Sequence, residues 1–157
     1  MNQLAVRTPS QLAIRSKIDG LQATMEKAVE DGELEQNIED CEKNFDQANH
    51  YHGQGVYARS LFIPAGTCVV GKIHKQDRIC MIMQGECTFV DEWHKETVKA
   101  PYIGEFKAGS KTAVYAHTDC LWVACMGTDE KHADGLLGLI ESTHEDYQLY
   151  LEHLEDK

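Results

Sequence analysis

Residues 55–75 have the sequence GVYARSLFIPAGTCVVGKIHK, and this stretch decides the fold. Its first part, VYARSLFI (56–63), is rich in the aromatic and branched side chains that favour β-strands. Pro64 ends that strand, and PAGT (64–67) has the composition of a turn. The chain then enters CVVGKIH (68–74), a second strand-like run. The pattern predicts two short strands joined by a turn.

Further strand-like runs follow at short intervals, separated by glycine, proline or aspartate. Many short strands with such punctuation are typical of a β-sandwich or a small barrel, which we expect over residues 50–128. The run at 79–83 has no polar alternation, so we expect a central strand that is buried on both faces. The runs are ICMIM (79–83), CTFVDEW (87–93), ETVKAPYIGEF (96–106), TAVYA (112–116) and CLWVAC (120–125).

Residues 8–48 have the signals of a helical region. Thr8 suits the N-cap, Pro9 suits the first helical position, and Gln11 completes a capping box. Apolar side chains then recur at alternating spacings of three and four, and Gly32 interrupts this period. The flanks are polar and strongly acidic. We therefore expect an N-terminal acidic helical extension with a turn or kink at Gly32.

Residues 130–157 return to a helical pattern, with apolar side chains on one face and acidic side chains around the rest. We expect a C-terminal amphipathic helix that packs on the core. The apolar face consists of Leu136, Leu137, Ile140, Tyr147, Leu151 and Leu154.

The composition predicts one soluble domain and excludes several partners. A chain of 157 residues can bury a core of its own. Its formal net charge of -11 argues against nucleic acid and against an anionic membrane surface. None of the six cysteines forms a CxxC pair, so we expect buried free thiols in a reducing compartment. The start has no signal-peptide pattern and no run is long enough to span a membrane, so we expect a cytoplasmic protein.

The strand region resembles the cupins, which have a double-stranded β-helix or jelly-roll fold. It is most similar to small cupin-like proteins of tailed phages and prophages. The resemblance implies a mainly β fold: a cupin-type jelly-roll barrel with an N-terminal helical extension and a C-terminal helix. The matching residues are His50, 55–59, 64–67, 71–75, 100–102, 109–111, Asp119 and Trp122.

The metal-binding pattern that cupins commonly carry is incomplete here. His74 fits the first histidine, but Gln76 replaces the second. No glutamate follows at 79–81, and Thr112 stands where a later histidine is expected. One ligand of four does not hold a metal tightly, so the resemblance implies a degenerate site with no cofactor.

Several polar and aromatic residues are candidates for lining the mouth of the barrel. Positive charge there, in so acidic a chain, would favour an anionic small ligand such as a nucleotide or a sugar phosphate. Two alternatives stay open: Arg59 could pair with surface acids, and residues 49–55 could be an exposed turn. The candidates are His50, Tyr57, Arg59, His74, Arg78 and Trp122.

Three functions are consistent with the sequence. The first is a non-catalytic binding protein, phage-encoded, that acts as an accessory or counter-defence factor on a host protein through its acidic helices, at Glu35, Glu39 and Glu42. The second is the anionic-ligand binder described above. The third is a metal-dependent isomerase or dioxygenase with His50, His52 and His74 as ligands. Because cupins often pair through strand edges, we also expect a homodimer.

Overall fold

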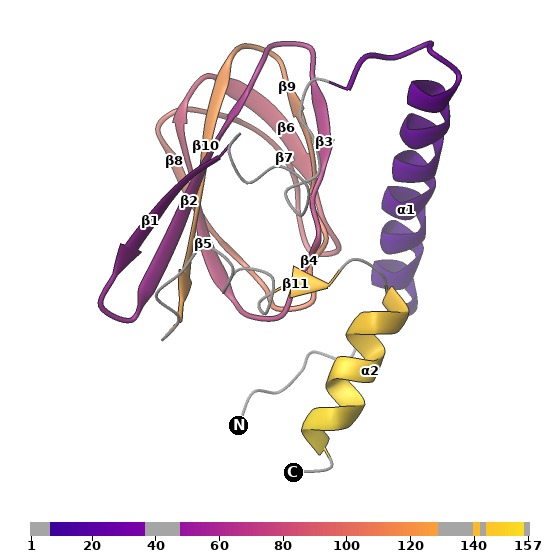
Figure 1. Ribbon diagram of the computed structural model, residues 1–157, viewed down its shortest axis with the longest axis vertical. Helices are drawn as coiled ribbons and strands as arrows, with labels where there is room; N and C mark the ends of the chain where they lie inside the picture. The colour runs from indigo at the N-terminus through magenta and orange to yellow at the C-terminus, as the bar shows by residue number, and fades with distance from the viewer. Residues whose placement is uncertain (1–6, 37–47, 129–139, 142–143, 156–157) are drawn as a thin grey trace.

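The structure is a computed structural model that describes residues 7–36, 48–128, 140–141 and 144–155. Two antiparallel β-sheets face each other, and two helices stand on one side of them (Figure 1). The fold is therefore mainly β, as the sequence predicts.

The larger sheet has five strands in the order β1-β2-β10-β5-β8. At its centre β10 pairs with β2 over eight residues and with β5 on its other side. The strand β1 was left open between turn and strand by the sequence, and the structure shows it paired with β2. The five strands are β1 (Ala48–Gly53), β2 (Val56–Ile63), β5 (Arg78–Gln84), β8 (Tyr102–Phe106) and β10 (Cys120–Gly127).

The smaller sheet has four strands in the order β3-β9-β6-β7. A separate two-stranded pair, formed by β4 and β11, brings Ile140 opposite His74. These strands are β3 (Cys68–Val70), β4 (Ile73–His74), β6 (Glu86–Val90), β7 (Lys95–Lys99), β9 (Ala113–Ala116) and β11 (Ile140–Glu141).

The order of the strands is that of a jelly roll. From β2 onward the chain alternates between the sheets, so that β2, β5, β8 and β10 belong to one and β3, β6, β7 and β9 to the other. This double-sheet arrangement of eight antiparallel strands is one of the ways in which all-β proteins close a core. The jelly-roll barrel expected from the sequence is confirmed.

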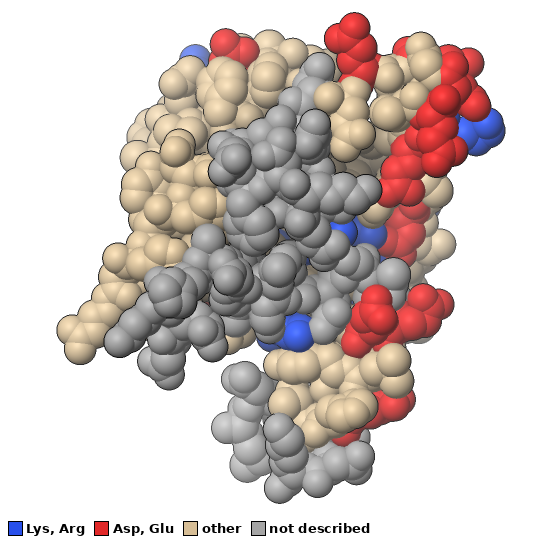
Figure 2. All heavy atoms as spheres, viewed as in Figure 1, with Lys and Arg blue, Asp and Glu red and all other residues tan. Residues whose placement is uncertain are grey.

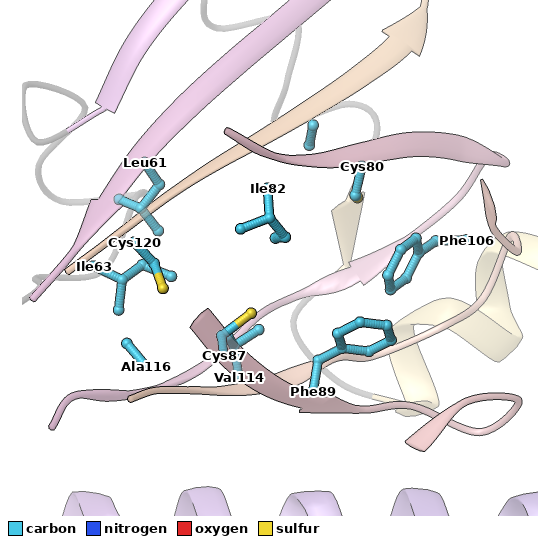
Figure 3. Close-up of a cluster of buried hydrophobic side chains, with 11 residues drawn as sticks. Leu61, Ile63, Cys80, Ile82, Cys87, Phe89, Phe106, Val114, Ala116 and Cys120 are labelled. Carbon is cyan, nitrogen blue, oxygen red and sulfur yellow. The ribbon is translucent and has the colours of Figure 1, made fainter. Parts of the chain in front are cut away.

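The core lies between the two sheets, where side chains from both point toward one another (Figure 3). Phe89 packs against Phe106 with ring centroids 5.2 Å apart. Burial of each such side chain contributes about 1.5–3 kcal/mol. Cys87 and Cys120 are also fully buried here, and burial raises the pKa of the Cys87 thiol to about 12. The five cysteines that the structure describes are free, as expected.

The prediction for the strand at 79–83 is half wrong. It is central, but only its inward side chains, Cys80 and Ile82, are buried. Ile79 is 45% exposed and Met83 is 57% exposed on the other face of the sheet. An uninterrupted apolar run does not distinguish a strand covered on both faces from one whose outer face is apolar and bare.

The N-terminal helix α1 (Pro9–Glu30) begins as predicted. Thr8 is the N-cap, and both hydrogen bonds of the capping box with Gln11 are present. The helix ends just before Gly32, whose φ of 75° suits glycine. The predicted second helix of the extension falls mostly on residues 37–47, outside the described part of the chain.

The C-terminal helix α2 (His144–Glu155) is shorter than the predicted range. Residues 129–139 are not described. The expectation of helix at Ile140 is wrong, because Ile140 and Glu141 form β11 and satisfy the backbone of β4 instead. Neither described helix is long and apolar enough to cross a membrane.

Candidate functional site

The hairpin of β1 and β2 brings together three of the predicted ligand-binding residues. His50 lies opposite Arg59, and cross-strand neighbours project from the same face of a sheet. A hydrogen bond of 2.6 Å joins His50 Nδ1 to Tyr57 Oη. The His52 ring lies 5.1 Å from the buried Tyr57 ring. The hairpin thus carries a cluster of polar and aromatic groups on the side of the sheet that faces the core.

His74 lies at the end of β4 and is buried, with only 7% of its surface exposed. Its backbone is held by Ser110 and Gly109, at 3.3 and 2.6 Å. Its Nδ1 has no hydrogen-bond partner among the described residues. Burial lowers the pKa of His74 well below its ordinary value of 6.5, and the positive charges of Arg78 and Arg59 lower it further. At neutral pH the ring is therefore uncharged and has one unsatisfied polar atom.

Arg78, at the start of β5, brings a permanent positive charge into the same region. Its Nη1 donates to Ser110 Oγ at 2.8 Å and its Nη2 donates to Thr112 Oγ1 at 3.1 Å. The guanidinium carbon lies 5.2 Å from the centre of the Phe106 ring. Burial lowers the pKa of Arg78, but an arginine stays protonated at neutral pH. Together with Arg59 it makes the surroundings of His74 electropositive.

Trp122 belongs to the wall of the core rather than to this polar group. Its ring meets Phe89 and Phe106 edge to face, at 5.9 and 5.7 Å. Phe106 is the side chain that Trp122 shares with Arg78. The structure therefore links Trp122 to the site through one aromatic ring, and its predicted contact with a ligand stays a prediction.

The described residues do not fit a metal centre. Among them no group of three histidine, cysteine, aspartate or glutamate side chains is placed to hold a metal ion. The alternative triad of His50, His52 and His74 is therefore not assembled. Thr112, at the position expected for a ligand histidine, accepts a hydrogen bond from Arg78 instead. A protein site for a catalytic transition metal needs about three such ligands.

A second buried polar cluster joins α1 to the barrel, and the sequence reasoning missed it. The fully buried Glu92 carboxylate forms an ion pair with Arg15 and accepts a hydrogen bond from the backbone N of Lys111 at 3.1 Å. Arg7 and Arg15 both donate to the carbonyl oxygen of Gly109. The one available signal was that Arg15 falls on the inward face of the helical period. The stretch around Glu92 reads as an exposed hairpin tip, so its burial could not be foreseen.

Residues 109–112 connect the two polar groups. Ser110 and Thr112 bind Arg78, while Gly109 binds the arginines of α1. Lys111 lies between them and forms an ion pair of 2.6 Å with Asp19 of α1. The position of α1 and the position of Arg78 therefore depend on the same short loop.

A hollow of about 370 Å³ lies elsewhere, at the end of the five-stranded sheet. It is lined by residues of β5, β8 and β10 and by both ends of an ion-pair group on Lys107. Ile79 and Cys125, which face each other across β5 and β10, point away from the core. The hollow is therefore on the outer surface and does not contain the His74 group.

Comparison with known proteins finds no matching family model and no matching curated protein. Solved structures with a similar course of the chain are cupins. A cupin-2 domain protein from Shewanella frigidimarina is 10% identical, with a TM-score of 0.44, over 58% of this chain and 95% of that one. A cupin superfamily protein from Desulfitobacterium hafniense is 14% identical, with a TM-score of 0.45, over 61% and 95%. The DMSP lyase DddQ from Ruegeria pomeroyi is 18% identical, with a TM-score of 0.46, over 58% and 52%. The assignment to the jelly roll rests on this chain's own strand order.

Proposed function

We propose that this chain is a non-catalytic binding protein whose barrel takes an anionic small molecule, such as a nucleotide or a sugar phosphate. The observation that carries the proposal is His74, buried with an unsatisfied Nδ1 beside two arginines that depress its pKa. A buried polar atom without a partner costs about 1–3 kcal/mol, which a ligand that supplies the partner can relieve. A protonated phosphate oxygen would donate to Nδ1 while its anionic oxygens face Arg59 and Arg78.

Arg78 supports this proposal because of where it sits. In the resemblance to cupins, Thr112 stands at the position of a metal ligand, and here it holds the Arg78 guanidinium. A guanidinium has five N–H donors in a fixed plane, and Ser110 and Thr112 engage two of its nitrogens. The fixed cation would take the part that a metal plays in attracting an anion, without the open coordination position that metal-dependent catalysis requires.

Calorimetric titration with orthophosphate, nucleotides and sugar phosphates tests the proposal. Loss of one charge-assisted hydrogen bond costs about 1.5–3 kcal/mol, so Arg59→Gln should weaken binding of the responding anion by about 10- to 150-fold. The control is Lys95→Gln, which removes an exposed positive charge on β7 and should bind as before. Absence of binding by every anion at millimolar concentration, or equal binding by Arg59→Gln, would reject the site.

The acidic surface of α1 favours a second candidate, a protein partner with a basic surface. Glu26, Glu30 and Glu33 are exposed, and acidic side chains follow the helix along one edge of the molecule (Figure 2). Glu35 is exposed too, whereas Glu39 and Glu42 lie outside the described residues. In the phage setting implied by the sequence resemblance, the partner would be a host protein and the chain an accessory or counter-defence factor.

Charge reversal tests this second candidate. A variant with lysine at Glu35, Glu39 and Glu42 should lose the host protein that the original chain captures from a lysate. Glu105→Lys is the control, because Glu105 is an exposed acid on the other side of the barrel. Retention of the same captured protein by the triple variant would remove these residues from the interface.

A further inference from the structure

The outer face of the five-stranded sheet is apolar and uncovered among the described residues. We call it the outer face and define it by Phe62, Ile79, Met81, Met83, Ile103 and Val123. Ile103 is 67% exposed, Met83 57% and Phe62 48%. Single exposed apolar side chains are ordinary, but a contiguous group on one sheet marks an interaction surface.

The strand register shows that these side chains form one continuous surface. Val123 of β10 lies opposite Met81 of β5, and Met81 lies opposite Ile103 of β8. One row further along, Phe62 of β2 lies opposite Leu121 of β10. Residues directly opposite in antiparallel strands have Cβ atoms about 4.5–5.5 Å apart, so their side chains touch. The apolar surface therefore runs without a break across four strands.

The distribution of charge points to the occupant. In the rows just described, Glu105 is the one acidic residue, and it lies at the rim with Lys107 at 3.8 Å. Lys107 also lies 3.9 Å from Asp77, so the rim carries a nearly neutralised group. The exposed acids of α1 stand on the opposite side of the molecule, and the side formed by the five-stranded sheet is almost free of charge (Figure 2). Two chains of net charge -11 can approach each other here without bringing like charges together.

The size of the outer face is close to that of a dimer interface. Five strands about 4.8 Å apart are about 24 Å wide, and seven residues at about 3.4 Å each are about 24 Å long. The product is roughly 580 Å² before the relief of the side chains is added. A stable interface needs about 800 Å² on each partner. The outer face is therefore large enough to hold a dimer if most of it is covered.

We propose that the outer face binds the same face of a second copy of this chain, giving a two-fold symmetric homodimer. A face without charge is self-complementary in the sense that a two-fold interface requires, because each apolar row meets an apolar row of the partner. This arrangement differs from the strand-edge pairing expected from the sequence. It is independent of the proposed ligand site, whose residues project from the other side of the same sheet.

Sedimentation analysis of the full chain tests the dimer. We expect a species of twice 17.7 kDa that dissociates on dilution. Ile103→Glu and Met83→Glu each place a carboxylate in a desolvated interface twice, and each should weaken dimerisation at least about 100-fold. Both positions are exposed in the single chain, so the circular dichroism spectrum and the thermal midpoint of the isolated subunit should be retained. Two variants keep the test valid if one of them fails to fold.

The matched control is Leu12→Glu, which puts the same charge on a 44% exposed apolar residue of α1 and should leave the dimer intact. The dissociation constant should also stay equal or fall when NaCl is raised from about 50 mM to about 500 mM, because salt screens the repulsion of two acidic chains. A dimer held by ion pairs would weaken instead.

Three results would overturn the proposal. The first is a monomer up to about 200 µM, a concentration at which even a weak homodimer would be visible; the outer face would then be covered by this chain's own segment or by another protein. The second is a dimer that survives both glutamate variants, which would return the interface to a strand edge. The third is equal weakening by Leu12→Glu.

Discussion

Gly85, in the turn between β5 and β6, shows how one residue can fix the approach of two strands. Its φ of 86° is in the left-handed region, and a Cβ at this position would overlap the backbone oxygen of Asp119. The turn is thus pressed directly against the start of β10. Gly66 has a similar φ of 79°, but a Cβ there would meet nothing within 4 Å.

This pair separates backbone strain from steric overlap. Gly66→Ala should lose about 1 kcal/mol of unfolding free energy, the cost of a left-handed alanine. Gly85→Ala should lose about 3 kcal/mol or more, because the overlap with rigid backbone is added to the same strain. Urea unfolding of the two variants measures the difference. Equal losses would mean that β10 moves aside at little cost.

His74 makes stability depend on pH. In the unfolded chain its pKa returns to about 6.5, whereas in the folded protein burial and the two arginines hold the pKa well below that value. As the pH falls below about 6.5, the unfolded chain takes up a proton that the folded protein refuses, so the unfolding free energy falls. The slope from this one group is at most about 1.4 kcal/mol per pH unit.

Unfolding measurements at pH 7.5, 6.5 and 5.5 test this. His74→Gln should show a shallower loss of stability toward acid than the original chain, because glutamine takes up no proton. His153→Gln, which alters an exposed histidine of α2, should keep the original slope. Parallel curves for the original chain and His74→Gln would mean that His74 is protonated in the folded protein.

The residues of the candidate site differ in how well the sequence predicts them. His50, Tyr57 and Arg59 could be placed together, because alternation along a strand puts Tyr57 and Arg59 on one face. The contact between Arg78 and Thr112 could not be predicted, since it joins residues 34 apart whose pairing depends on how the chain crosses between the sheets. Long-range contacts of this kind leave no periodic trace in the sequence.

At the scale of elements, α1 is held to the barrel mainly by buried charge. Arg15 and Glu92 have side chains only 3% and 0% exposed. Lys27 and Asp31 form an ion pair on the same helix, but their side chains are 72% and 48% exposed. The physical setting of the two pairs is therefore opposite, although both join a base to an acid.

Arg15→Met should cost about 3–5 kcal/mol, because the buried Glu92 carboxylate then lacks its partner. Lys27→Met should cost less than about 1 kcal/mol, the ordinary value of an exposed ion pair. Hydrogen exchange should also show faster exchange of α1 amides in Arg15→Met while the barrel strands stay protected. A small loss for Arg15→Met would mean that α1 is held by its apolar contacts alone.

Element by element, local signals predicted best. The capping box of Thr8 and Gln11 was predictable because both partners lie in one turn of helix. Pro64 and Gly66 marked the turn between β2 and β3 for the same reason. The exposure of Ile79 and Met83 was not predictable, because it depends on whether another layer covers the sheet. Composition alone does not carry that information.

At the scale of the whole molecule, the net charge of -11 acts against the compact state. Raising NaCl from about 10 mM to about 150 mM shortens the range of this repulsion to about 8 Å. We expect the unfolding free energy to rise over that interval by about 1 kcal/mol, while the buried Arg15–Glu92 pair is little affected. Urea unfolding at both salt concentrations measures it, and a fall in stability would mean that exposed ion pairs outweigh the repulsion.

The carbonyl oxygen of Gly109, which receives both arginines of the N-terminal region, imposes an order of events during synthesis. Gly109 follows Arg7 by 102 residues and Arg15 by 94. At about 5–20 residues per second, the ribosome delivers it roughly 5–20 seconds after α1 has been made. Throughout that interval α1 has no anchor and Arg15 has no acid to meet. The first helix to leave the ribosome is therefore among the last parts of the chain to reach its final place.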